Sequence, residues 1–159
     1  MKFILLTHER ELSKSSNTGQ LVRQVLGDDV EIIVWKRKEP EPRLVHLFKT
    51  KQAALLFPDS LSREAKNISL NNERGRYSFC VILDSTWQEA RKMFNRSQYL
   101  KDADKVSIQT SGVSEYSLRR NQIEGGLSTA ECVMEVLLAC GQINERNSLR
   151  NQFILFNET

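Results

Sequence analysis

An apolar run that leads directly into a helix start constrains the fold of this chain most strongly. Residues 79–83 have the length and composition of a buried β-strand. Asp84 follows at once, and Thr86 with Glu89 fits the capping-box pattern that opens a helix. The carboxyl end of the strand therefore delivers an acid, hydroxyls and Trp87 to a helix N-terminus. In open α/β sheets, ligands bind at this edge.

Strand and helix patterns alternate along the rest of the sequence. The expected strands are residues 2–7, 30–35, 53–57, 79–83 and 106–109. The expected helices are residues 17–26, 85–96, 128–140 and 144–156, with Ser85 and Gln88 as an alternative capping pair for the second of them. The segment with Pro40 and Pro42 is expected to be hydrophilic, residues 67–76 turn-like and residues 114–126 a loop. The alternation predicts an α/β fold, with a mostly parallel sheet flanked by helices, in a single domain of residues 1–159.

The composition is that of an ordinary globular protein, with 40% hydrophobic and 27% charged residues. A net charge of +3 permits a nucleic-acid partner without requiring one. Cys80, Cys132 and Cys140 lack CxxC spacing, so we expect a reducing compartment and core positions for the first two. We also expect a cytoplasmic protein, because the sequence shows no secretory signal and no apolar run of membrane-spanning length.

Several common chemistries lack their signatures in this sequence. No GxGxxG pattern follows a strand and no P-loop pattern occurs, so dinucleotide binding and P-loop phosphate chemistry are not expected. His8 and His46 have no metal-binding spacing to the cysteines, so we expect no metal site. A serine hydrolase is disfavoured because the GxSxG elbow is absent. The remaining material for a site is hydroxyls, backbone amides, a carboxylate, a tryptophan and arginines.

Polar residues gather in three loops that follow expected strands, namely residues 17–19, 58–60 and 84–87. Residues 127–129 add a further helix start. Helix N-termini attract carboxylate and phosphate groups because their N–H groups are unpaired and the helix dipole is positive there. These loops favour a zwitterionic or anionic small molecule that lies across the sheet edge.

Five blocks of the sequence also occur in a characteristic order. The central block is Asp-Ser-Thr-Trp at residues 84–87, followed by Gln88, Ala90, Arg91 and Lys92. The other blocks are Asn-Thr-Gly at 17–19, Leu-Phe-Pro-Asp at 56–59, Tyr-Ser-Leu-Arg-Arg at 116–120 and Gly-Leu-Ser-Thr-Ala-Glu at 126–131. Together they resemble the blocks of the DTW-domain family over most of the chain, from residue 7 to about residue 141.

The resemblance implies a tRNA-uridine aminocarboxypropyltransferase. Such an enzyme moves the 3-amino-3-carboxypropyl group of S-adenosylmethionine to N3 of a tRNA uridine, here expected in the variable loop, and releases methylthioadenosine. The family is similar to a ribosomal-RNA transferase, which implies a SPOUT-like fold with a trefoil knot. Longer members carry an N-terminal segment that is rich in cysteine and looks zinc-binding. The sequence in hand begins at its first expected strand, so we expect that segment to be missing.

The resemblance also implies roles for particular residues. Asp84 is the catalytic candidate, as the base or the orienting group for uridine N3, and the alternative is a carboxylate that only caps a helix or accepts loop N–H bonds. Trp87 is expected to form a wall with the donor's sulfonium over its face, and the alternative is a core tryptophan. The expected cofactor-binding residues are Thr18, Gly19, Leu56, Phe57, Pro58, Leu83, Ser85, Thr86, Trp87, Leu118, Leu127, Ser128, Thr129 and Ala130. The expected RNA-binding residues are Arg91, Lys92, Tyr116, Arg119 and Arg120, whereas Lys36–Lys38 are expected to be a solvated cluster.

Two other readings stay open at this point. A SPOUT-type RNA methyltransferase would use the same cofactor and fold but would transfer methyl and leave S-adenosylhomocysteine. A non-catalytic RNA-binding protein would need only the basic loops. The intact blocks at residues 84–87 and 127–131 argue against the second reading.

Overall fold

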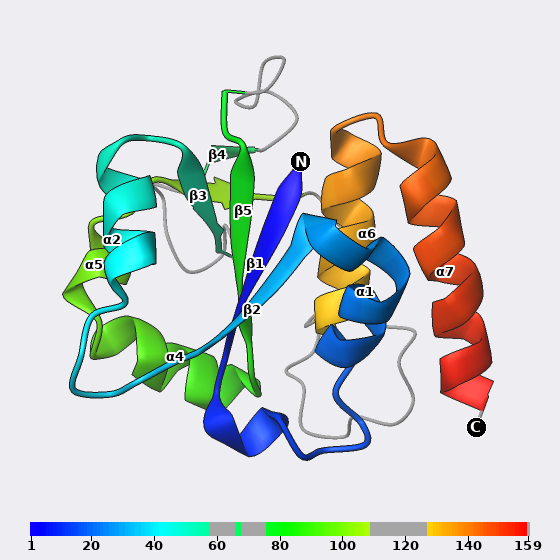
Figure 1. Cartoon of the computed structure of the whole chain (residues 1–159), viewed down its shortest axis with the longest axis horizontal. Helices are drawn as coiled ribbons and strands as arrows, with labels where there is room; N and C mark the ends of the chain where they lie inside the picture. The colour runs from blue at the N-terminus through cyan, green and yellow to red at the C-terminus, as the bar shows by residue number, and fades with distance from the viewer. Residues whose placement is uncertain (58–65, 68–75, 109–126, 159) are drawn as a thin grey trace.

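The structure is a computed structural model that describes residues 1–57, 66–67, 76–108 and 127–158. Six strands form one sheet in the order β2-β1-β5-β3-β6-β4, and every neighbouring pair is parallel (Figure 1). The strands are β1 (Lys2–Thr7), β2 (Val30–Val34), β3 (Ala53–Leu56), β4 (Lys66–Asn67), β5 (Phe79–Asp84) and β6 (Lys105–Ser107). The parallel α/β fold expected from the sequence is therefore confirmed.

Helices cover both faces of the sheet. One face carries α1 (Gly19–Leu26), α6 (Thr129–Ala139) and α7 (Ile143–Glu158), at the right of Figure 1. The other face carries α2 (Pro42–Lys49), α4 (Trp87–Asn95) and α5 (Gln98–Lys101). Two short 3-10 turns, η1 (Glu9–Glu11) and η2 (Gly27–Asp29), follow β1 and precede β2. The result is a three-layer arrangement with the sheet in the middle.

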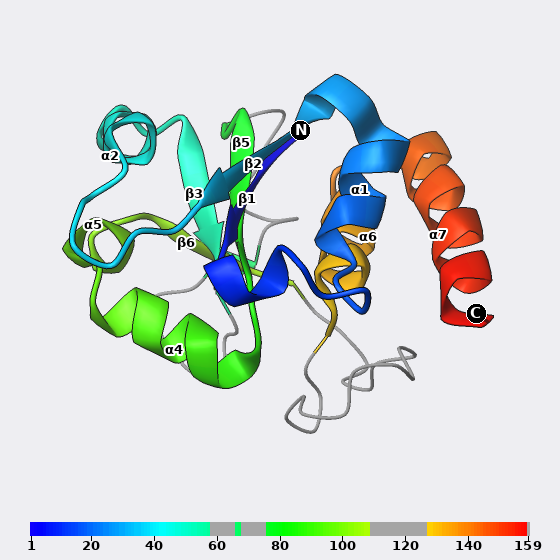
Figure 2. The ribbon, with the colours of Figure 1, turned by 60° about the horizontal axis from the view of Figure 1, so that its bottom comes forward.

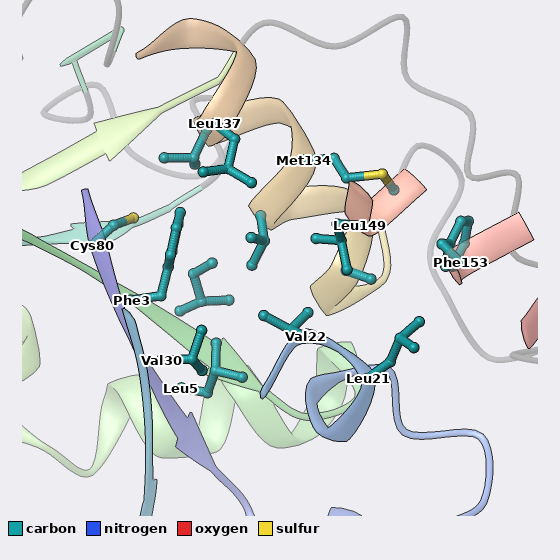
Figure 3. Close-up of a cluster of buried hydrophobic side chains, with 14 of the residues drawn as sticks. Phe3, Leu5, Leu21, Val22, Val30, Cys80, Met134, Leu137, Leu149 and Phe153 are labelled. Atoms are coloured by element: carbon teal, nitrogen blue, oxygen red, sulfur yellow. The ribbon is translucent and has the colours of Figure 1, made fainter. Parts of the chain in front are cut away.

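Two separate hydrophobic clusters hold the layers together, because successive side chains of a strand point to opposite faces. In β1, Phe3 and Leu5 enter the cluster under α1, α6 and α7, while Ile4 and Leu6 enter the cluster under α2, α4 and α5. Figure 3 shows the first cluster, in which residues of α1, α6 and α7 pack on the sheet. A strand that is buried on both faces explains the continuous apolar run at residues 3–6.

Capping boxes start two of the helices at the carboxyl edge of the sheet. In α4, the Glu89 N–H donates to Thr86 Oγ1 at 3.2 Å, and the Thr86 N–H donates to Glu89 Oε1 at 3.0 Å. In α6, the Glu131 N–H donates to Ser128 Oγ at 3.3 Å, and the Ser128 N–H donates to Glu131 Oε1 at 3.0 Å. Both boxes were expected, and of the two pairs considered for α4 the structure uses Thr86 with Glu89.

Two helices were not expected from the sequence, namely α2 and the four-residue α5. Residues Pro42–Lys49 form α2, although only a hydrophilic segment is expected there from the sequence. Pro42 occupies the first helical turn, which a proline tolerates because the N–H there has no partner within the helix. The Glu41 carboxylate accepts from the Arg43 N–H at 3.4 Å, and the apolar stripe of α2 is buried against the sheet.

The path of residues 109–126 lies outside the described residues, and so does the expected loop at 114–126. The trefoil knot that the resemblance implies depends on that path, so it stays a prediction.

Candidate functional site

Asp84 is the centre of the carboxyl edge of the sheet. It ends β5, and its register partner at the end of the neighbouring β1 is Thr7. The Thr7 hydroxyl donates to Asp84 Oδ2 at 3.3 Å. Only 1% of the Asp84 surface is exposed, so the carboxylate is held inside the protein and not at its surface.

Two further side chains donate to this carboxylate from other elements. Asn17 Nδ2 lies 3.0 Å from both Oδ1 and Oδ2 of Asp84, and Thr129 Oγ1 lies 2.8 Å from Oδ1. The Asn17 amide is oriented for this contact, because its Oδ1 accepts from the Gln20 N–H at 3.1 Å. Both oxygens therefore act as acceptors, which is the hydrogen-bonding role of an ionised carboxylate.

A second buried carboxylate lies beside the first. Glu11 is fully buried, and its Oε2 lies 3.4 Å from Asn17 Nδ2, so one amide group bridges two acids. Lys14 Nζ, 3.2 Å from Glu11 Oε1, supplies the positive charge that balances this side of the site. Because Asn17 contacts both acids, it fixes the position of the segment between η1 and α1.

Three helix N-termini meet around Asp84. Gly19 begins α1, and a Cβ at this position would come within 2.4 Å of Asp84 Oδ2, so the close approach requires glycine. Thr18 Oγ1 accepts from the Ala130 N–H at 3.0 Å, which joins the start of α1 to the start of α6. The third helix, α4, begins at Trp87, three positions after Asp84. Figure 2 turns this edge of the molecule toward the viewer.

His8 extends the site on the side of β2. Its backbone N–H donates to the Asp84 carbonyl at 3.1 Å, its Nδ1 lies 3.6 Å from Glu89 Oε2, and its ring stacks on Trp35 with centroids 5.9 Å apart. Burial alone would raise the pKa of Glu89, but hydrogen bonds from Thr86, with His8 and Lys14 nearby, outweigh it and lower that pKa. Glu89 therefore stays ionised at the start of α4.

The structure brings together some of the expected cofactor-binding residues and separates others. Thr18, Gly19, Ser128, Thr129 and Ala130 are buried around Asp84. Five others are half-buried: Leu83, Ser85, Thr86 and Trp87, which lie next to Asp84 in the sequence, and Leu127, which precedes Ser128. Trp87 belongs to neither hydrophobic cluster of the described residues, so the reading as a core tryptophan finds no support there.

Other expected residues lie in different surroundings. Leu56 packs on the cluster under α6 and Phe57 on the cluster under α4, where its ring is 4.6 Å from that of Phe94. Arg91 and Lys92 are exposed on α4. Pro58, Tyr116, Leu118, Arg119 and Arg120 lie outside the described residues.

Sequence reasoning did not select Asn17, Thr7, Glu11 or His8 as site residues. Asn17 stands in the block at residues 17–19, so its motif was a usable signal. The contact from Thr7 follows from the pairing of β1 with β5, which no local pattern predicts. Within the described ranges, no three His, Cys, Asp or Glu side chains are placed to hold a metal ion. No helix in these ranges is long and apolar enough to cross a membrane.

Comparison with known proteins finds relatives along almost the whole chain. The chain is similar to proteins named tRNA-uridine aminocarboxypropyltransferase 2 from Drosophila melanogaster and from Macaca fascicularis. The first is 27% identical over 160 residues, which cover 96% of this chain and 60% of the relative. The second is 24% identical over 154 residues, which cover 95% of this chain and 50% of the relative. The chain thus spans between half and three fifths of the length of these curated relatives.

No solved structure matches the chain. The DTW-domain model matches residues 1–159, so the chain belongs to the DTW-domain family.

Proposed function

We propose that this chain transfers the 3-amino-3-carboxypropyl group of S-adenosylmethionine to N3 of a uridine in the variable loop of tRNA. The observation that carries the proposal is the convergence of three helix N-termini on the buried Asp84 in a chain of the DTW-domain family. The names of the curated relatives support the same reaction class. We further propose that residues 1–159 form one domain, and that the protein works in the cytoplasm and without a metal.

The reaction is a displacement at the γ-carbon of the methionine moiety. A bond forms between uridine N3 and this carbon while the bond from the carbon to sulfur breaks. The bonding electron pair goes to sulfur, which leaves as neutral methylthioadenosine, and the N3 proton passes to a base or to water. The positive charge of the sulfonium disappears along the reaction path, so a fixed negative charge nearby favours binding of the donor and does not speed the displacement itself.

The residues at the edge supply the groups that such a donor needs. The N-terminus of α1, at Thr18 and Gly19, attracts the carboxylate of the aminocarboxypropyl group. Trp87, half-buried and outside both clusters, offers its face to the sulfonium. Phe57 and Leu83, which both pack on the cluster under α4, form the apolar side for adenine, together with Pro58 and Leu118, whereas Leu56 packs on the opposite face of the sheet. The segments Ser85–Thr86 and Leu127–Ala130 close the pocket from the starts of α4 and α6.

Asp84 acts as an anchor and a fixed charge more than as a base. Its carboxylate is 1% exposed and already accepts from Thr7, Asn17 and Thr129, so its oxygens have little capacity left for a proton. In this role it holds the starts of α1 and α6 against β5 and presents negative charge beneath the donor. The tRNA approaches over the exposed Arg91 and Lys92 of α4, with Tyr116, Arg119 and Arg120 as further contacts.

The deciding experiment identifies both products of one incubation. Purified protein is mixed with S-adenosylmethionine and unmodified tRNA, and mass spectrometry identifies the adenosine product and the tRNA nucleosides. Methylthioadenosine with aminocarboxypropyl-uridine is the expected result. S-adenosylhomocysteine with a methylated nucleoside would overturn the proposal in favour of a methyltransferase. Binding of tRNA with neither product, and without any effect of S-adenosylmethionine, would favour a non-catalytic RNA-binding protein.

The pH dependence of the reaction rate shows whether Asp84 acts as an anchor or as a general base. The test compares Asp84→Asn with Gln88→Ala, a change at an exposed position in the first turn of α4. An anchor predicts that Asp84→Asn weakens donor binding and lowers stability at every pH, without a new slope in the pH–rate profile. A base predicts normal donor binding and a rate that recovers as the pH rises.

A further inference from the structure

A hollow of about 610 Å³ lies on the flank of the molecule that carries α2 and α5, away from α1, α6 and α7. Its walls are the connection from β2 to α2, α2 itself, and the turn from α4 to α5. Six basic residues line it: Lys36, Arg37, Lys38, Lys49, Lys51 and Arg96. The acidic residues of the lining are Glu39 and Asp102, so the hollow has a strong excess of positive charge.

Most of this charge has no partner of its own within the described residues. Lys51 pairs with Asp104 at 2.9 Å. The other five basic side chains are exposed and form no ion pair or side-chain hydrogen bond within those parts of the chain that the structure describes. Just outside the hollow, by contrast, Arg43 pairs with Glu31 at 2.9 Å. Unneutralised cations on a concave surface attract an anionic partner.

The cations are spread along the hollow and not gathered at one point. Lys36–Lys38 precede the N-terminus of α2. Lys49 is the last residue of α2, and Lys51 follows it. An eight-residue helix is about 12 Å long. One small anion needs only one or two of these cations, whereas a row of this length matches a chain of phosphates with a charge at every few ångströms.

A hydrogen bond to Ser97 holds the frame of the hollow. The Trp35 indole N–H donates to Ser97 Oγ at 2.9 Å. This bond ties the connection from β2 to α2 against the turn from α4 to α5. Tyr99 also lines the hollow and is half-buried, so it offers part of an aromatic side chain beside the cations.

Two elements, β2 and α4, lead from the hollow to the edge that carries Asp84. The Trp35 N–H donates to the Thr7 carbonyl at 2.9 Å, and Thr7 pairs in register with Asp84. Two strand spacings, roughly 10 Å, therefore separate the backbone at Trp35 from Asp84. Along the other side, α4 begins beside Asp84 and ends at the hollow, and Lys92 lies one turn before Arg96.

We infer that this hollow binds the sugar–phosphate backbone of the tRNA and holds it while a neighbouring nucleotide reaches the Asp84 edge. This inference rests on the proposed function and adds the place where the substrate is gripped. The contacts are to phosphates, so they position the RNA and carry no base sequence. The bound RNA runs from Lys49 and Lys51 past Lys36–Lys38 toward Lys92 and the start of α4.

The test compares two variants that lose the same charge in different places. The first combines Lys36→Gln, Arg37→Gln and Lys38→Gln in the hollow. The control combines Lys2→Gln, Arg23→Gln and Arg146→Gln, at the start of β1 and on α1 and α7. Binding of fluorescently labelled tRNA is measured for both at several salt concentrations. Calorimetric binding of S-adenosylmethionine and far-UV circular dichroism check that each variant is folded.

For the hollow variant we expect tRNA affinity to fall at least about tenfold near 0.1 M salt, and the slope of log affinity against log salt to decrease by about two. The KM for tRNA rises while kcat at saturating tRNA stays close to that of the wild type. The control variant keeps the affinity of the wild type within about threefold, because only general charge has changed.

Different results separate the failure of this inference from the failure of the proposed function. If both variants bind tRNA equally well while the wild type makes aminocarboxypropyl-uridine, the hollow is not the tRNA site and the proposed function stands. If the hollow variant loses tRNA binding but the wild type makes no such nucleoside, the site stands and the proposed reaction fails. Hollow-dependent binding to phosphatidylserine vesicles with unchanged tRNA binding would overturn the inference in favour of a membrane surface.

Discussion

The Thr129 hydroxyl lies 2.8 Å from Oδ1 of Asp84, although the two residues are 45 positions apart in the sequence. This hydrogen bond joins the first residue of α6 to the last residue of β5. With Asn17 and Thr7 as the other donors, it makes one carboxylate the meeting point of β1, α1 and α6. Substitution of any one of these donors therefore alters the carboxylate that the other donors bind.

Replacing Thr129 tests whether that bond shapes the site. Thr129→Val keeps the volume but removes the donor, so we expect a loss of about 1.5–3 kcal/mol in the free energy of unfolding, as for a hydrogen bond to a charged group. Donor binding should weaken at the same time. Urea titration and calorimetry measure the two effects. Thr129→Ser keeps the hydroxyl and is the control, and identical behaviour of the two variants would contradict the prediction.

Gly19 has a separate prediction because its role is steric. A methyl group at Gly19 would lie 2.4 Å from Asp84 Oδ2, so Gly19→Ala forces the carboxylate or the start of α1 to move. We expect a destabilisation of about 1–3 kcal/mol and at least a tenfold weaker affinity for S-adenosylmethionine. Gln20→Ala, at the exposed next position, is the matched control. Unchanged cofactor affinity in Gly19→Ala would show that the donor does not depend on this contact.

Glu89 makes part of the stability depend on pH. Its folded pKa lies below the ordinary value of 4.5, since the hydrogen bonds from Thr86 outweigh the effect of burial. The ionised form therefore stabilises the fold above that value, and this contribution is lost as the pH falls through the lowered folded pKa. We expect the free energy of unfolding of the wild type to exceed that of Glu89→Gln by about 0.5–1 kcal/mol at pH 7. The difference should be smaller at pH 3 than at pH 7, because the pH then lies below 4.5 and the contribution is lost as the pH falls through the lowered folded pKa.

Urea titrations at both pH values measure the effect of Glu89. Glu145→Gln removes an exposed carboxylate from the first turn of α7 and serves as a comparison. A gap between wild type and Glu89→Gln that stays constant down to pH 3 would rule out the charge as its source.

Cys80 and Cys132 should be unreactive in the folded protein. Burial raises the pKa of the Cys80 thiol far above its usual range. Burial also raises the pKa of Cys132, to about 12, with the negative charges of Glu131, Glu135 and Asp84 adding to the shift. At pH 8 very little thiolate is present at either residue, so iodoacetamide should label them only after unfolding. Mass spectrometry of native and urea-treated samples tests this, and fast native labelling of Cys132 would contradict it.

Much of the fold could be predicted from local patterns. The apolar runs at residues 2–7 and 79–83 are strands buried on both faces, and such runs carry their signal within a few residues. The boxes at Thr86 and Ser128 place two helix starts correctly, because a capping box is complete within four residues. Helix α2 was missed since Pro40 before it and Pro42 at its first position outweighed the spacing of Leu44, Leu47 and Phe48, which was visible in the sequence.

The site could be predicted only in part. Motif blocks identified Asp84, Thr18, Gly19 and Thr129 without showing that they meet. The contact between Asn17 and Asp84 spans 67 positions and depends on the order of strands in the sheet, which no local pattern contains. The hollow was missed for a similar reason. In the sequence Lys36–Lys38 are an ordinary charged run, and only the structure places the turn from α4 to α5 opposite them.

The pairing of β1 with β5 has a consequence for synthesis of the protein. Thr7 and Asp84 are 77 positions apart, so the middle of the sheet cannot close until the chain as far as residue 84 has left the ribosome. Until then β1 and β3 each lack the neighbour that lies between them, and an unpaired apolar strand edge is a template for pairing with other chains. Parallel strands joined over such separations also fold slowly. The nascent chain is therefore more vulnerable to aggregation than the finished protein, and nascent-chain chaperones matter most for it in the interval between β3 and β5.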